Sequence, residues 1–222
     1  MSYYEDLTNY EYLDSRYELD ESYSVLNIGW IDGLHKYNVG NVPEQFLPRL
    51  WEYIIVPMNR TRGLHYDCIL DGQNKTFVAK FQKYAIKLGD AEIRVIDEEH
   101  KVVYASPNLI LHYIIDHRYC PPKCFIDAVM NGPKPDSICY KKILVEKDKS
   151  NMDTKVGCIF CGAHKTRLGF CYDIKRDDTK KIEVVEWENN IDISQENLIY
   201  NAICRECGGI FDVPLKAISQ TM

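Results

Sequence analysis

The spacing of apolar residues predicts both helices and strands in the first two thirds of the chain. In "VPEQFLPRLWEYIIV" (42–56), apolar side chains recur every three or four residues, as on one side of a helix. Pro48 must lie near the start of this helix or break it, since proline has no backbone N–H to donate. The segment is therefore predicted to form a helix that begins close to Pro48.

An alternating pattern follows in "AEIRVIDEEHKVVYA" (91–105). Ile93 and Val95 alternate with Arg94 and Asp97, then "DEEHK" interrupts the pattern and "VVYA" resumes it. Two short alternating runs on either side of a polar turn are typical of a β-hairpin. The sequence thus predicts a hairpin with one apolar and one polar face.

A helix pair is predicted for residues 106–133. Ser106 is a natural N-cap with Pro107 at the first helical position, and Pro121 and Pro122 restart a helix after "RYC". Asn131-Gly132 then provides a C-cap. The few bases in this pair give it a poor electrostatic surface for DNA.

Beyond "GPKPDS" (132–137), which we interpret as a linker, the chain is predicted to be mostly β. Five short strand-like segments surround two Cys-x-x-Cys turns: "YKKILVEK" (140–147), "TRLGFCYDIKR" (166–176), "KKIEVVEWEN" (180–189), "NLIYNAIC" (197–204) and "GGIFDVPL" (208–215). The predicted fold class is therefore α+β, with a mixed domain at 26–135 and a mostly β, zinc-ribbon-like module at 136–222.

Residues 1–25 form an acidic, tyrosine-rich arm with seven acidic residues and one base, Arg16. A helical stripe is predicted from the spacing of Tyr3, Leu7, Tyr10, Leu13 and Tyr17. Two interpretations remain open. The stripe packs on its own domain or stays frayed, or Tyr3, Leu7, Tyr10 and Tyr17 dock on a partner protein with a basic surface.

Composition excludes several classes of protein. With 45% hydrophobic and 27% charged residues, the 222-residue chain is long and apolar enough to build a core, which argues against disorder. No apolar run has the length of a transmembrane helix, and the acidic N-terminus differs from a signal peptide. We expect a cytoplasmic protein whose nine cysteines are reduced or bind metal.

Charge and the remaining motifs do not favour the other functional classes. The net charge of −6 equals that of the arm, so the body is formally neutral and lacks the basic surface that drives non-specific nucleic-acid binding. No catalytic residue is predicted, because no hydrolase, phosphate-loop or metalloprotease motif occurs. Isolated carboxylates such as Asp32 and Asp71 are interpreted as turn residues.

Two Cys-x-x-Cys-Gly turns predict a zinc site. The predicted ligands are Cys158, Cys161, Cys204 and Cys207. Each turn places two sulfurs on one side of a tight loop, and Gly162 and Gly208 can adopt a positive φ that lets backbone N–H groups point at the thiolates. Because 42 residues separate the two turns, strands are expected between them. Four thiolates close the Zn²⁺ shell, so this metal is predicted to be structural.

A second metal site is left open. Its candidate ligands are His65, Cys68, His112, His117, Cys120 and Cys124. On one continuous helix His112 and His117 would differ by about 140° around the axis and could not face the same ion. The competing interpretation is that these histidines are ordinary core or hydrogen-bonded residues.

The N-terminal part resembles an uncharacterised family of small bacterial proteins. The resemblance rests on "IGWIDGLHKYNVGNVPEQF" (28–46), "NRTRGLH" (59–65), "GDAEIRV" (89–95) and "YASPNLILHYIIDHRYCPPKCFIDAV" (104–129). It implies an intact domain of bacterial or phage origin and no known activity. Members of that family tend to carry a cysteine pair after the histidine of "RG-x-H", whereas here only Cys68 follows His65, a departure that argues against a metal site at His65.

Three functions are compatible with this sequence. The first is a zinc-stabilised interaction module that binds a protein partner, for example a bacterial or phage immunity or defence-related adaptor. The second is a nucleic-acid-binding zinc-ribbon regulator, for which "HKTR" (164–167) with the lysines and arginine of 175–181 is the best candidate surface. The third is a small metal-dependent nuclease or hydrolase, which would need histidines at the cysteine turns to activate water.

Overall fold

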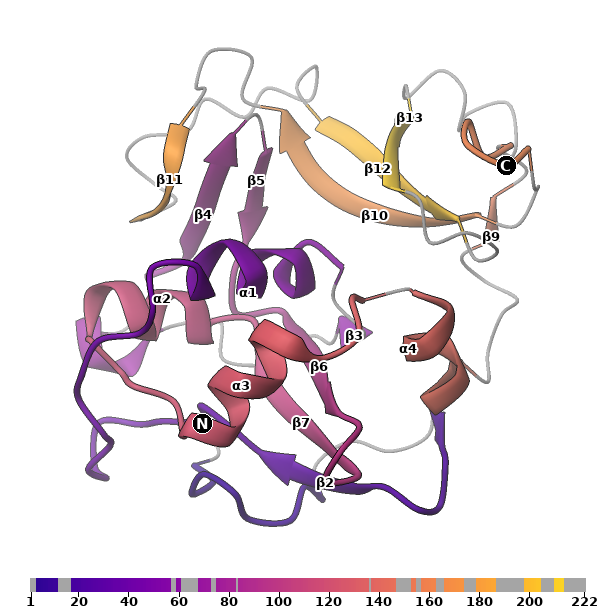
Figure 1. Ribbon diagram of the computed structural model, residues 1–222. Helices are drawn as coiled ribbons and strands as arrows, with labels where there is room; N and C mark the ends of the chain where they lie inside the picture. The colour runs from indigo at the N-terminus through magenta and orange to yellow at the C-terminus, as the bar shows by residue number, and fades with distance from the viewer. Residues whose placement is uncertain are drawn as a thin grey trace.

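The fold is α+β, as predicted from the sequence. We describe it from a computed structural model (Figure 1). The structure describes residues 3–11, 17–56, 59–60, 68–72, 75–82, 84–135, 137–146, 153–154, 157–162, 166–173, 179–186, 198–204 and 210–213.

Helices occupy the middle of the chain. Within the described residues they are α1 (Phe46–Ile54), α2 (Ile110–Asp116), α3 (Lys123–Asn131) and α4 (Ile138–Ile143), with a 3-10 turn η1 at Ile69–Asp71. Helix α1 lies inside the predicted range, with Pro48 in its first turn, where the missing N–H costs nothing. The helix pair is also confirmed, since Pro122 is the N-cap of α3 and Gly132 its C-cap.

The predicted start of the first helix of this pair was wrong. Ser106 and Pro107 are the last residues of a strand, where they pair with Ile93 and Glu92, and the N-cap of α2 is Leu109. Pairing with the neighbouring strand therefore overrides the local capping preference of Ser-Pro, because proline is tolerated at the end of a strand.

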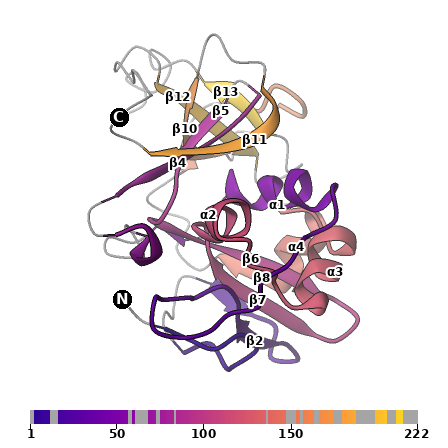
Figure 2. The ribbon, with the colours of Figure 1, turned by 90° about the vertical axis from the view of Figure 1, so that its left-hand side faces the viewer.

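A four-stranded sheet forms one half of the molecule. Its strand order is β2 (Ser24–Asn27), β7 (Val102–Pro107), β6 (Ala91–Asp97) and β3 (Asn59–Arg60). Strands β6 and β7 form the predicted antiparallel hairpin, and β2 pairs parallel to β7. Helices α1 and α3 lie on the side of this sheet that faces the rest of the molecule (Figures 1 and 2).

A seven-stranded sheet forms the other half. Its order is β11 (Thr179–Glu186), β4 (Phe77–Gln82), β5 (Tyr84–Lys87), β10 (Thr166–Asp173), β12 (Leu198–Cys204) and β13 (Ile210–Val213), with β9 (Asp153–Thr154) paired to β10. The strands predicted in 166–176, 180–189, 197–204 and 208–215 are confirmed within the described residues, as β10, β11, β12 and β13. Since β4 and β5 come from residues 77–87, the sheet combines strands from both sides of the boundary expected at 135/136 (Figure 2).

Residues 140–147 do not form the expected single strand. Helix α4 occupies their first part, and its N-cap Ser137 accepts a hydrogen bond from the backbone N–H of Tyr140. Only β8 (Leu144–Glu146) is extended, and it pairs antiparallel with β1 (Tyr17–Leu19). The serine cap, which the apolar pattern does not reveal, explains why a helix forms here.

The predicted amphipathic helix in the acidic arm was wrong. Residues 3–11 instead run beside β2, with isolated bridges that pair Tyr4 with Trp30 and Asn9 with Leu26. Leu7 has φ 67°, a conformation that no right-handed helix contains. The free edge of β2 supplies backbone partners for residues on either side of the turn at 6–8, which explains why this stretch is not helical.

The arm also covers a polar face of the sheet. The alternating pattern assigned Arg94 to the polar face of β6, but Arg94 and Glu92 are both buried and form an ion pair at 2.7 Å. The Tyr10 ring lies over the Arg94 guanidinium, 4.6 Å from it, and the Tyr10 hydroxyl donates to the Glu92 carboxylate. The arm is thus packed on its own domain in this structure.

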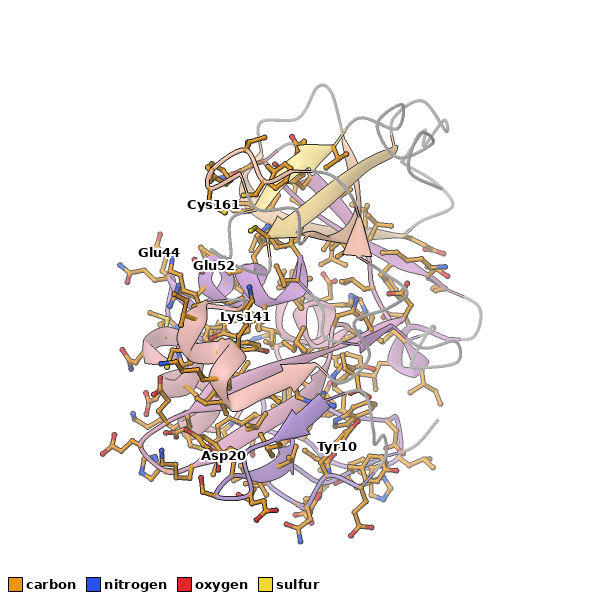
Figure 3. The ribbon with its side chains drawn as sticks, turned by 90° about the vertical axis from the view of Figure 1, so that its right-hand side faces the viewer. Tyr10, Asp20, Glu44, Glu52, Lys141 and Cys161 are labelled. Carbon is orange, nitrogen blue, oxygen red and sulfur yellow. The ribbon has the colours of Figure 1, made fainter. Side chains whose placement is uncertain are left out.

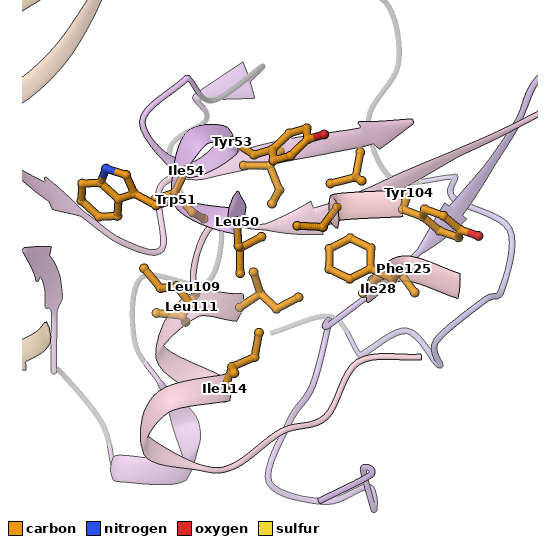
Figure 4. Packing of buried hydrophobic residues seen from close by; sticks show 14 of the residues in the cluster. Ile28, Leu50, Trp51, Tyr53, Ile54, Tyr104, Leu109, Leu111, Ile114 and Phe125 are labelled. Atoms are coloured by element: carbon orange, nitrogen blue, oxygen red, sulfur yellow. The ribbon is translucent and has the colours of Figure 1, made fainter. Parts of the chain in front are cut away.

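The main core lies between the helices and the two sheets. In Figure 4, Leu50 and Ile54 of α1 point toward the same cluster as Phe125 of α3. Phe125 contacts Phe46 edge to face at 6.3 Å and Tyr104 of β7 at 5.8 Å. These aromatic contacts fix α1 and α3 on the four-stranded sheet.

Candidate metal centres

The first candidate centre, which we call the cysteine knuckle, contains Cys158, Cys161 and Cys204. Their sulfur atoms all lie within 4.8 Å of one another. Cys158 and Cys161 precede β10, Cys204 ends β12, and the antiparallel register pairs Thr166 with Cys204. Strand pairing thus brings the two ends of a 42-residue segment together. The fourth predicted ligand, Cys207, lies outside the described residues.

The turn between Cys158 and Cys161 has the geometry expected of a metal-binding loop. The Phe160 backbone N–H donates to the Cys158 sulfur at 3.4 Å, and the Gly162 N–H donates to the Cys158 carbonyl at 2.8 Å. Gly162 has φ 72°, as predicted. The sulfurs of Cys161 and Cys204 lie 3.6 Å apart, close to the roughly 3.8 Å edge of a tetrahedral zinc–thiolate site. This three-cysteine cluster could bind a metal ion.

Helix α4 lies next to the knuckle. The Lys141 ammonium donates to the Cys204 carbonyl at 3.0 Å. Figure 3 shows Lys141 below Cys161. This hydrogen bond joins α4 to the end of β12, where Cys204 lies.

The second candidate centre, which we call the Cys68 cluster, combines four side chains of different chemistry. Its members are Cys68, Asp71, His112 and His117, whose ligand atoms all lie within 4.8 Å of one another. One Asp71 oxygen is 2.8 Å from Nε2 of both histidines. The two Nε2 atoms are 3.2 Å apart, and the Cys68 sulfur is 3.3 Å from Nε2 of His117.

The end of a helix makes this convergence possible. Helix α2 stops at Asp116, and His117 at its C-cap has φ −104° and ψ 3°, followed by Arg118 with φ 54°. The 140° separation expected for a continuous helix therefore does not apply, because the backbone turns the His117 ring back toward His112. On the other side, η1 places Asp71 three residues after Cys68 on one tight turn.

Neighbouring groups hold the buried His112 ring. Its Nδ1 is 2.6 Å from a carboxylate oxygen of Asp116, and its ring stacks on Phe77 of β4 at 3.9 Å. Phe77 thus covers one face of the His112 ring, while Asp116 fixes the orientation of the ring. Ligating histidines in proteins are commonly oriented by such a carboxylate.

The surroundings shift the pKa values of Cys68 and Asp71 in opposite directions. Burial, together with the Asp71 carboxylate, raises the pKa of the Cys68 thiol to about 12. Burial alone would raise the pKa of Asp71, but hydrogen bonds from Cys68, His112 and His117 lower it to about 2. Without a further positive charge, Cys68 is therefore a thiol and Asp71 a carboxylate.

Of the other candidates for a second metal site, Cys120 and Cys124 do not join this cluster. Cys120 contacts the Asn41 carbonyl, Cys124 lies beside the Tyr104 hydroxyl, and His65 lies outside the described residues. Asp71 was expected to be only a turn residue. Its three-residue spacing from Cys68 was the signal in the sequence that could have found it.

The arm residues predicted to bind a partner differ in how far they are engaged in contacts within the chain. Tyr3 stacks on the His35 ring at 3.7 Å and Tyr10 contacts the buried Glu92 and Arg94, whereas Leu7 is 43% exposed. The Tyr17 side chain lies outside the described set. Partner binding by these residues stays a prediction.

A family model described as a domain of unknown function (DUF7919) matches residues 2–130, more than half of the chain. The chain belongs to this family. No curated protein and no solved structure matches it. The Cys68 cluster lies inside the DUF7919 region, which is the part that the sequence resemblance identified. The cysteine knuckle lies beyond it, so a C-terminal zinc ribbon has no support from family membership.

The DUF7919 region contains helices of only moderate length. Among the helices that could be described, none is long and apolar enough to cross a membrane. The helices of this family domain instead pack on the two sheets through their apolar sides.

Proposed function

We propose that this protein is a zinc-stabilised interaction module that binds a partner protein through the exposed tip of the cysteine knuckle. The observation that carries the proposal is the position of Ile159 and Phe160. They lie between Cys158 and Cys161, two of the proposed metal ligands, and are 71% and 63% exposed. Large apolar residues held outward on a tight turn are suited to insertion into a pocket of another protein.

The metal in this proposal is Zn²⁺ bound by Cys158, Cys161, Cys204 and Cys207. Four thiolates leave no open coordination position, so the ion stabilises the module and takes no part in chemistry. In small zinc modules such a site contributes on the order of 10–16 kcal/mol of binding free energy, which is comparable to the stability of a whole domain. The reduced cysteines that this requires agree with a cytoplasmic protein.

The ring of Phe160 already has a fixed neighbour. It contacts Phe211 of β13 edge to face at 6.1 Å, which limits its rotamers before any partner arrives. A side chain ordered in advance loses less conformational entropy on binding. We therefore expect Phe160 to contribute more to affinity than the residues around it, with a cost of about 2 kcal/mol or more on truncation.

An adaptor in a bacterial or phage defence system is the kind of role that fits this proposal. The acidic arm would favour a partner with a basic surface, since opposite charges accelerate association. Because Tyr10 is engaged with the sheet, the exposed acids of the arm would steer the partner while the knuckle tip supplies the apolar contact.

Affinity capture from native cells tests this proposal. A partner recovered with the full chain should be lost with the double variant Ile159→Ser/Phe160→Ser. It should be retained by Leu34→Ser, a matched control that removes an 89% exposed apolar side chain elsewhere. Equal recovery by both variants would show that the knuckle tip is not the contact, and the zinc content of each variant shows whether the knuckle is intact.

A further inference from the structure

We propose that Cys68, Asp71, His112 and His117 form a second metal site, for a tetrahedral Zn²⁺ ion, inside the family domain. The two sites share no ligand, so this proposal does not rest on the knuckle or on partner binding.

The distances in the cluster are close to those of a tetrahedral shell. With metal–nitrogen and metal–oxygen distances of about 2.0–2.1 Å, neighbouring ligand atoms lie about 3.3 Å apart. The two Nε2 atoms are 3.2 Å apart, and each is 2.8 Å from the same Asp71 oxygen. An outward movement of a few tenths of an ångström would admit the ion without a change of backbone path.

The donor set selects the metal. One thiolate and two imidazoles favour zinc over Mg²⁺ or Ca²⁺, which prefer shells of oxygen. The single carboxylate is compatible with zinc, whose sites accept aspartate oxygen at similar distances. The four donors complete a tetrahedron, and Asp71 is the most exposed of them, with 28% of its side chain accessible.

The surroundings of the cluster resemble the outer shell of a metal site. His112 offers Nε2 to the cluster while Asp116 engages its Nδ1 at 2.6 Å, an arrangement that fixes which nitrogen is free to bind metal. Phe77 closes one face of this ring. Bound metal would join η1 to the C-terminal end of α2, two segments that lie about 40 residues apart in the sequence.

The test is the zinc content of the full-length protein purified without chelator. We expect two equivalents per chain in the wild type. Cys68→Ser and His117→Gln should each lose one equivalent, and Cys204→Ser should lose the other. Cys139→Ser, at a half-buried position that faces Glu98, and His100→Gln, at an exposed position that faces Asp97, are matched controls outside both clusters, and they should keep the wild-type content.

A ligand variant could also lose metal because it fails to fold, so a milder change separates the two causes. Asp116→Asn leaves all four ligands in place and should weaken zinc binding at this site about 10–100-fold in competition with a chromogenic chelator. Circular dichroism would show an unchanged fold.

Two results would overturn the proposal. One is a zinc content that is unchanged by Cys68→Ser and His117→Gln. The other is an affinity that is the same in Asp116→Asn and the wild type. In either case the four side chains form only a hydrogen-bonded network. Failure of the knuckle site is recognised separately, because Cys204→Ser would then retain all the zinc that the wild type holds.

Discussion

Histidine residues occupy two kinds of environment in this protein. His35 and His100 each lie on an exposed turn, with Nδ1 2.9 Å from an aspartate three residues earlier. His112 and His117 instead converge on the Asp71 carboxylate, where the His112 ring is buried and the His117 ring half-buried. The exposed histidines therefore stabilise local turns, whereas the more buried ones contact residues distant in the sequence.

The turn at Asp32 gives a prediction about acid stability. Burial alone would raise the pKa of Asp32, but hydrogen bonds from the His35 ring and from the backbone N–H groups of His35 and Leu34 lower it. A lowered folded-state pKa stabilises the fold above the unfolded value of 3.8, and this contribution disappears as pH falls through the folded value.

Asp32→Asn should remove this dependence, because its side-chain oxygen can still accept the backbone hydrogen bonds but does not titrate. We expect the wild type to lose more stability than the variant between neutral pH and pH values below 3.8. Urea unfolding at a series of pH values measures the difference. Parallel curves for the two proteins would contradict the prediction.

Tyr10 gives a prediction about the role of the arm. Tyr10→Phe keeps the ring over Arg94 but removes the hydroxyl that donates to the buried Glu92 carboxylate. A hydrogen bond to a charged group contributes about 1.5–3 kcal/mol, so the free energy of unfolding should fall by that amount. Glu11→Ala, at an exposed neighbouring position, should change it by less than about 0.5 kcal/mol. Unchanged stability in Tyr10→Phe would mean that the arm detaches easily, as partner docking by Tyr10 requires.

At the scale of elements, the end of α3 shows how closely helices and strands approach. Gly132 is the C-cap of α3, and its backbone N–H donates to the Ala128 carbonyl. A Cβ atom at this position would lie 2.4 Å from the Ile96 carbonyl oxygen and 2.5 Å from that of Ala128. The C-cap therefore needs glycine because β6 lies directly against it.

Gly132→Ala should accordingly destabilise the protein by about 1–3 kcal/mol or more, since backbone atoms on two elements must move. Gly33→Ala is the matched control, because its new Cβ would meet only side-chain atoms, at 3.8 Å or more. That control should stay within about 0.5 kcal/mol of the wild type. Thermal unfolding of both variants measures the contrast, and equal midpoints would show that α3 and β6 separate readily.

At the scale of the whole molecule, the core crosses the domain boundary expected from the sequence. Tyr140 is buried and its hydroxyl donates to the Arg94 carbonyl at 2.7 Å, while Ile143 and Leu144 belong to the main core cluster. Strand β8 also pairs with β1 from the arm. The segment after residue 135 therefore completes the fold of the segment before it.

Truncation tests this dependence. A chain ending at residue 135 lacks α4 and β8, and loses about 1.5–3 kcal/mol for each of Ile143 and Leu144 before Tyr140 is considered. Because whole domains are stable by only about 5–15 kcal/mol, we expect this chain to be unfolded or aggregated. A chain ending at residue 146 retains these contacts and should be several kcal/mol more stable. Equal stability of the two chains in urea would show that the core ends at residue 135.

Local patterns determined much of the architecture. Periodicity alone located α1, the hairpin of β6 and β7, and the strands β10, β12 and β13. The Cys-x-x-Cys-Gly motif located the Cys158 turn. Helices, tight turns and short strands are encoded by residues near one another in the chain, which is why local patterns find them. The positive φ of Gly162 follows from the same kind of local chemistry.

Only the tertiary structure decided which distant residues meet. Asp71 became a partner of His112 and His117 because α2 ends at Asp116 and η1 folds against it. Residues 3–11 of the arm run beside β2 because that strand offers them a free edge, and this pairing outweighs the helical spacing of the tyrosines. Glu92 and Arg94 are buried because that arm covers them. Apolar spacing shows that a face will be covered, but the partner depends on sheet order and helix ends, which are set by contacts between residues far apart in the chain.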